Sequence, residues 1–98
     1  MNIGKKQDEG CLTLKVEGRL DTNTAPELES ELELDGVKEV VFDFSELEYI
    51  SSAGLRVLMV THKTMAAATG AVKILHPNAT VLGVFGITGL DSVFTIEQ

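Results

Sequence analysis

Two adjacent serines, Ser51 and Ser52, stand at the start of a stretch with helical periodicity. The first turn of a helix carries unpaired N–H groups and about half a positive charge, which suits a phosphoryl group. Phosphorylation there would add about −1.5 to −2 charges at pH 7. A serine at this point can equally well be a helix cap, worth about 1 kcal/mol. Two serines exceed what a cap requires, and the residues alone leave both interpretations open.

Two aspartates, Asp21 and Asp43, each follow a predicted strand. In an open α/β sheet, functional residues gather at the carboxyl ends of the strands, where the following helices begin. We therefore expect both carboxylates to border Ser52, where they would orient its hydroxyl or contact a partner. The alternative is that they only end strands and cap turns.

The longest predicted helix covers residues 52–68 and has two unlike faces. One stripe at 3.6-residue spacing is expected to be buried: Leu55, Leu58, Met59, His62, Met65 and Ala66. The opposite face is small and apolar: Ala53, Val57, Val60 and Thr64. Arg56 and Lys63 border that face. Because a solvent-facing stripe normally carries more charge, this one favours a docking surface for a partner protein, with Ser52 at its end. The alternative is a face covered by the chain's own terminal segments.

Strands alternate with helices along the chain, which predicts one α/β domain over residues 1–98. The expected strands are 1–6 and 11–17, joined as an N-terminal antiparallel hairpin, then 40–42, 71–75 and 93–96. A first helix is expected from Thr24, which would form a capping box with Glu27, to a stop at 35–36. A short helix capped by Asn78 should precede the last strand. We expect a mixed, mostly parallel sheet of four to five strands with helices packed on it.

The composition excludes several classes of function. The chain has 98 residues, 15 acidic and 8 basic, and a net charge of −7, so we expect no direct binding of nucleic acid. No run of about 18 apolar residues could span a bilayer, and the start MNIGKKQDEG lacks the apolar region of a secretory signal. Cys11 is the only cysteine, so an internal disulfide is excluded. These features predict a cytoplasmic protein that inserts in no membrane.

Enzymatic chemistry with Ser52 as nucleophile would need a positioned base and an oxyanion hole. His62 lies about 15 Å further along the helix, at 1.5 Å per residue, and His76 lies in a turn. The sequence has no GxSxG elbow, metal-ligand cluster or phosphate-cradling glycine motif. We expect no enzymatic activity, no metal and no cofactor. The nearest rival is a phospho-aspartate receiver with Asp21 and Asp43 in one pocket.

Three segments, in order along the chain, resemble one family. Val40–Leu58 (VVFDFSELEYISSAGLRVL) resembles the signature of STAS domains, in particular the bacterial anti-sigma-factor antagonists. Gly18–Leu28 (GRLDTNTAPEL) is similar to an upstream block of that family, and Gly89–Ile96 (GLDSVFTI) to its closing strand. Because the resemblance covers nearly the whole chain, it is far more specific than one short motif.

The resemblance implies a partner-switching protein. The unphosphorylated form would bind an anti-sigma factor, which is also its serine kinase, and so release a sigma factor. Phosphorylation would end that contact, and a serine phosphatase would reset it. The alternative is an unphosphorylated STAS subunit of a lipid-transport ATPase or of another signalling complex.

The resemblance also implies which residues act. The family acceptor lies two residues before the glycine of a Gly-Leu pair, which gives Ser52, with Ser51 as second choice. Many members carry Asp where this chain has Ser51, a departure that lowers the local charge and adds a hydroxyl. The expected partner-binding residues are Asp21, Thr22, Asp43, Ser51, Ala53, Gly54, Arg56, Val57 and Val60.

Overall fold

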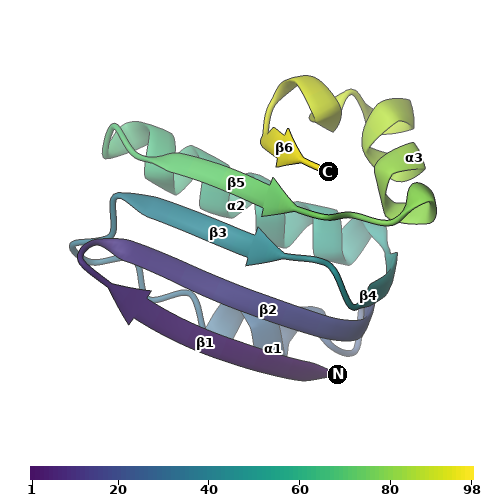
Figure 1. Ribbon diagram of the computed structural model, residues 1–98, viewed down its shortest axis with the longest axis horizontal. Coiled ribbons are helices and arrows are strands. Elements are labelled where there is room, and N and C mark those ends of the chain that lie inside the picture. The colour runs from purple at the N-terminus through teal and green to yellow at the C-terminus, as the bar shows by residue number, and fades with distance from the viewer.

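A computed structural model describes all 98 residues and shows a mixed sheet with its helices (Figure 1). The strands are β1 (Asn2–Asp8), β2 (Cys11–Leu20), β3 (Glu39–Asp43), β4 (Leu47–Ile50), β5 (Ala71–Leu75) and β6 (Thr95–Glu97). The helices are α1 (Ala25–Ser30), α2 (Ser52–Ala67) and α3 (Ala79–Thr88), followed by the short 3-10 helix η1 (Leu90–Ser92).

The sheet is mostly parallel, with one antiparallel pair at its N-terminal edge. The strand order is β1-β2-β3-β5-β6, and β4 pairs with the far end of β2. The antiparallel pair is the hairpin β1–β2, whose turn residues Glu9 and Gly10 both have positive φ, as a two-residue hairpin turn requires. All other pairings are parallel. The predicted fold class and the hairpin are therefore confirmed.

The sheet has six strands, one more than the upper end of the predicted range. The additional strand is β4, which lies between Asp43 and Ser52, where no strand is predicted. Its register against β2 shifts between Gly18 and Arg19, a bulge that breaks the period of two. Along β4, Leu47 and Ile50 are both buried although they are three residues apart. That spacing gives no strand-like alternation in the sequence.

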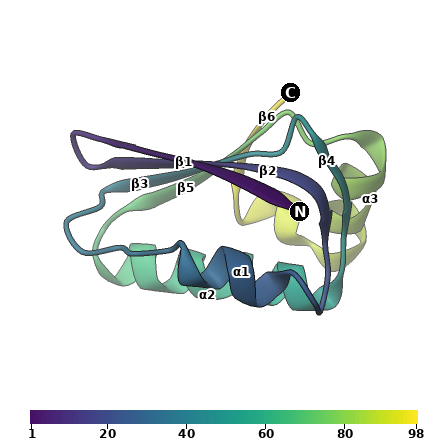
Figure 2. The same cartoon turned by 90° about the horizontal axis from the view of Figure 1, so that it is seen from below.

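The core lies between one face of the sheet and the two helices α1 and α2, which lie on the same side of it (Figure 2). Leu12, Leu14 and Val16 alternate inward along β2 and are fully buried, as their spacing predicts. At the end of the sheet where β4 lies, α3 packs Val81 and Phe85 into the same core. Asn78 caps α3 as predicted, since its Oδ1 accepts a hydrogen bond from Val81 N–H at 2.8 Å.

The first helix is shorter than predicted and is capped differently. It ends at Ser30, with Glu31 as its C-cap. Leu32 and Leu34 both turn toward α2, which residues two apart in a helix cannot do, so the chain leaves the helix before them. Thr24 stands at the N-cap position but makes no capping bond. Its hydroxyl instead donates to Arg19 O at 2.8 Å and accepts from Asp21 N–H at 2.8 Å.

The last strand is also shifted. The structure starts β6 at Thr95 rather than at residue 93. Phe94 is buried against Phe85 and follows η1, so Val93 and Phe94 belong to the turn that packs on the core.

Candidate functional site

The two serines have different roles at the start of α2. Ser51 has extended backbone angles and is the N-cap, and its Oγ accepts a hydrogen bond from Gly54 N–H at 3.4 Å. Ser52 is the first residue of the helix and is exposed, and its hydroxyl makes no hydrogen bond within the chain. The first turn of α2 carries no acidic side chain. A cap and a free hydroxyl therefore stand side by side, and the free one belongs to Ser52.

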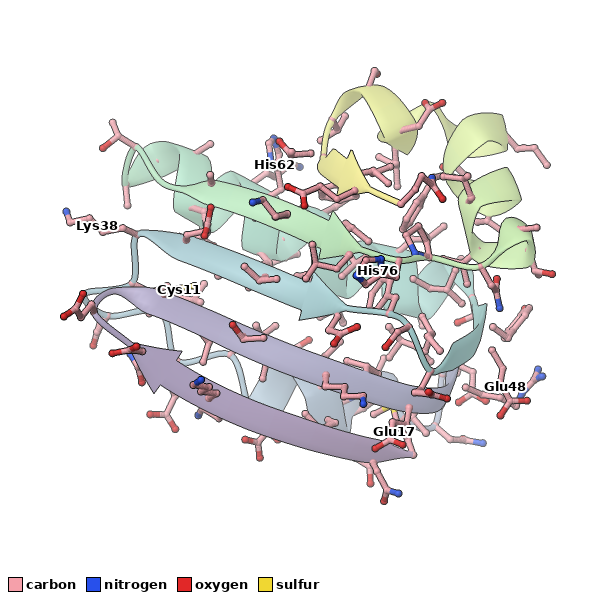
Figure 3. All side chains as sticks on the ribbon, in the orientation of Figure 1. Cys11, Glu17, Lys38, Glu48, His62 and His76 are labelled. Carbon is pink, nitrogen blue, oxygen red and sulfur yellow. The ribbon has the colours of Figure 1, made fainter.

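The strand β4 holds these serines against the end of β2. Leu20 and Ile50 are paired in the parallel register, and Ser51 N–H donates to Leu20 O at 2.9 Å. Gly54 is buried between the side chains of Leu20 and Ile50. Figure 3 labels Glu48 of β4 at the opposite end of the sheet from Cys11 and Lys38. The serines follow β4 at that same end.

Asp21 lies in the loop that leaves β2 directly beside the serines. Its Oδ1 accepts hydrogen bonds from the backbone N–H of Asn23 at 3.0 Å and of Thr24 at 3.2 Å. Partial burial raises the pKa of Asp21, but these N–H groups, the Thr24 hydroxyl and the Arg19 charge outweigh it and leave the pKa below its ordinary value. Asp21 is therefore an anion near Ser52. Thr22, the next residue, is exposed in the same loop.

Asp43 does not border the serines, contrary to the expectation from the sequence. It pairs in register with Lys15, five residues before Leu20, so it lies about 16 Å back along β2 at roughly 3.3 Å per residue. Both aspartates follow strands, but the insertion of β4 carries the serines past the end of β3. The Asp43 Oδ1 accepts from Ser45 N–H at 3.0 Å.

The charge state of Asp43 is set by its own neighbours. Partial burial raises its pKa, but hydrogen bonds from Ser45 and the charges of Lys15 and His76 outweigh that effect and leave the pKa below its ordinary value.

The predicted docking face of α2 is only partly exposed. Val60 is 57% exposed and Arg56 and Thr64 are exposed, whereas Ala53 is half-buried. Val57 is buried, so its predicted place on the outward face is wrong, and Gly54, expected among the partner-binding residues, is buried as well. The helix is rotated toward α1: its buried residues are Gly54, Val57, Leu58, Thr61 and Met65. Leu55, Met59 and His62 are only half-buried, and Ala66 is exposed.

A groove of about 400 Å³ runs between α1 and α2. Its lining is Glu29, Leu32, Leu34, Val57, Val60, Thr61 and Thr64. The contributions of Glu29, Leu34 and Thr61 are not predicted by the sequence pattern. Leu32 and Leu34 are two residues apart in a segment expected to be helical, where they would not share a face. No periodicity could have shown that they do.

No three His, Cys, Asp or Glu side chains lie together as metal ligands would. His62 packs edge-on against Phe94, with ring centroids 5.9 Å apart, rather than near Ser52. No helix has both the length and the apolar composition needed to cross a bilayer.

Comparison with known proteins decides the family. The model of the STAS domain matches residues 2–98. The chain belongs to the STAS family. This STAS domain is 33% identical to BtrV of Bordetella bronchiseptica over all of its length and 87% of that protein. It is 29% identical to the anti-sigma-B factor antagonist of Listeria monocytogenes, over its whole length and 91% of that protein.

Solved structures share the fold of this STAS domain. The anti-sigma factor antagonist SpoIIAA in its unphosphorylated form superposes with a TM-score of 0.86 at 18% identity, over 99% of this chain and 89% of that one. The phosphorylated form of SpoIIAA from Bacillus superposes with a TM-score of 0.79 at 17% identity, over 99% of this chain and 92% of that one. At these identities the likeness concerns the fold alone.

Proposed function

We propose that this STAS domain is an anti-sigma-factor antagonist controlled by phosphorylation of Ser52. Unphosphorylated, it binds an anti-sigma factor that is also its serine kinase, and a sigma factor is released. The single observation that carries the proposal is the exposed Ser52 hydroxyl, free of hydrogen bonds at the start of α2, beside a second serine that supplies the cap. The name of the Listeria relative, an anti-sigma-B factor antagonist, supports the role.

The fold can carry a phosphate on Ser52 without rearrangement. The hydroxyl has no bond to give up, and the N–H groups of the first turn of α2 favour a negative charge. No acidic residue in that turn opposes it. Phosphorylation therefore changes the surface and leaves the core as it is.

The same phosphate disrupts a partner contact. A dianion covered by a protein surface must be desolvated, and the anionic Asp21 in the neighbouring loop raises this cost, because the repulsion between the two charges strengthens when water is excluded. A penalty of about 3–4 kcal/mol would weaken binding several hundredfold, because about 1.4 kcal/mol is tenfold. A change in affinity of this size is sufficient to switch the contact on and off. A serine phosphatase would remove the phosphate and restore binding.

Ser52 serves as a phosphate acceptor rather than as a catalytic nucleophile in this proposal. The nearest histidine on the same helix, His62, is ten residues away, about 15 Å along the axis, and packs against Phe94. The chain is thus proposed to be a binding protein and not an enzyme. Because sigma factors act on RNA polymerase, we propose that it works in the cytoplasm.

The proposal is tested with the anti-sigma kinase and radiolabelled ATP. Wild type and Ser51→Ala should incorporate phosphate, and Ser52→Ala should not. Ser52→Ala should still bind the kinase. Ser52→Asp should not bind it, because the new carboxylate places a negative charge where the phosphate would be. Unchanged labelling of Ser52→Ala would remove Ser52 as the acceptor. Capture of a lipid-transport ATPase with no labelling of either serine would favour the alternative role.

A further inference from the structure

The groove between α1 and α2 has an apolar floor without unpaired polar groups. Val57 and Thr61 of α2 form part of it, opposite Leu32 and Leu34. The Thr61 hydroxyl donates to Val57 O at 2.8 Å, so its hydrogen-bonding capacity is used within its own helix. No buried side-chain polar atom in the chain lacks a partner. This floor suits apolar side chains.

Opposite charges stand unpaired on the two sides of the groove. Glu29 lines it from α1 and is exposed. On α2, Arg56 and Lys63 are exposed and flank Val60 at four residues before and three after, which makes them its neighbours on the helix surface. None of the three forms an ion pair within the chain. The groove therefore keeps the two signs of charge apart and leaves both available to an occupant.

We infer that the groove receives an amphipathic helix of the anti-sigma partner, with an apolar stripe between a basic and an acidic edge. Its apolar side chains would fill the floor, its basic edge would face Glu29, and its acidic edge would face Arg56 and Lys63. From Val57 to Thr64 the groove follows α2 for about 10 Å, two turns, which matches two anchors at helical spacing. The inference rests on the proposed function and specifies how the partner is held.

A second copy of the chain fits the groove less well. Each copy carries a net charge of −7, so association brings like charges together. A symmetric contact of α2 on α2 through Val60 would also bring Arg56 and Lys63 of each copy near those of the other. A partner helix with charges on both edges avoids these costs.

The groove leads along α2 toward Ser52. Ala53 precedes Val57 by one turn on the same side of α2 and adjoins Ser52. A partner helix that extends one turn beyond the groove, past Val57 to Ala53, would therefore come close to Ser52, where a phosphate would oppose it.

The test compares two substitutions that make the same change of charge. Val60→Glu places a carboxylate on the groove rim, and Ile87→Glu places one on α3, where Ile87 is 89% exposed. Affinity for the purified anti-sigma kinase is measured by calorimetry after circular dichroism confirms that both variants fold. Val60→Glu should weaken binding by about 30-fold or more, the loss typical of an interface hot spot, because its carboxylate would be buried against the apolar stripe of the partner helix. Ile87→Glu should bind like wild type.

The charge arrangement is tested separately. Glu29→Lys should weaken binding, and reversal of a basic residue on the partner helix should restore it. A photo-crosslinker at position 60 should capture a helical segment of the kinase.

Two results would overturn the inference while leaving the proposed function in place. One is that the Val60→Glu variant binds the kinase with the same affinity as the wild type. The other is a crosslink at position 60 only to a second copy of the chain. A wild type that binds no anti-sigma kinase would instead overturn the proposed function, and this inference with it.

Discussion

Gly54 packs directly on Leu20. A Cβ atom at position 54 would lie 2.7 Å from Leu20 Cγ and 2.8 Å from Ile50 Cγ1, both closer than real Cβ contacts. The missing side chain lets the first turn of α2 approach the paired ends of β2 and β4. That approach holds Ser52 beside the Asp21 loop, so the position of the proposed acceptor depends on a packing requirement two residues further along the helix.

Gly54→Ala is expected to destabilise the fold by about 1–3 kcal/mol, the usual cost of overpacking a well-filled core. Gly83→Ala is the matched control, because Gly83 lies in α3 and a Cβ atom at position 83 would have nothing within 4 Å. That change should stabilise by about 0.5–1 kcal/mol through helix propensity. Urea denaturation measures both. Equal stability of the two variants would contradict the packing account of Gly54.

Ser51→Ala should lower the free energy of unfolding by about 0.5–1 kcal/mol, because the cap bond to Gly54 N–H is lost and is already long at 3.4 Å. Ser52→Ala should leave stability nearly unchanged, since the Ser52 hydroxyl has no partner. Thermal denaturation of the two variants side by side separates cap from acceptor. A larger loss for Ser52→Ala would show that these roles are reversed.

The low pKa of Asp21 predicts a defined acid response. A carboxyl whose pKa is lowered by folding stabilises the fold above its unfolded pKa, near 3.8, and loses that contribution as the pH falls through the folded value. Asp21→Asn should therefore be less stable than wild type at pH 6, and the difference should shrink as the pH falls below 4. Urea denaturation at a series of pH values measures this difference in the free energy of unfolding.

The control for this experiment is Asp35→Asn, which makes the same change of charge at an exposed carboxylate whose side chain accepts no hydrogen bond. It should cost less stability at pH 6 than Asp21→Asn, because no side-chain hydrogen bond is lost. If Asp21→Asn and wild type differed by the same free energy of unfolding at all pH values, the proposed link between the Asp21 pKa and stability would be contradicted.

The two aspartates should differ in partner binding. Asp21→Asn should change affinity for the anti-sigma kinase, because Asp21 lies in the loop beside Ser51. Asp43→Asn should bind within about twofold of wild type, as a change remote from the contact does. Its carboxylate lies with Lys15 and His76, away from the serines. A larger effect of Asp43→Asn would place the partner on the other part of the sheet edge.

Local patterns predicted most of the fold. The alternation of Leu12, Leu14 and Val16 defines β2, and Asn78 marks the start of α3, because both signals arise from residues close in sequence. The strand β4 was not predicted because its pairing is irregular and long-range, and its two inward residues are three positions apart.

The site was predicted in part for the same reason. The helix start at Ser51 and Ser52 is a local signal, and the structure separates the cap from the free hydroxyl. The place of Asp43 depends on where β4 inserts, and the burial of Val57 depends on how α1 and the segment after it pack against α2. Both are tertiary effects that periodicity does not contain.

The most direct test of the switch is the dissociation constant of the anti-sigma kinase for two forms of the chain. One form is unmodified, and the other is phosphorylated stoichiometrically, with the site mapped by mass spectrometry. We expect modification at Ser52 alone and an affinity at least about 100-fold lower for the phosphorylated form, corresponding to a penalty near 3 kcal/mol. Equal constants for the two forms, with Ser52 fully phosphorylated, would contradict the account.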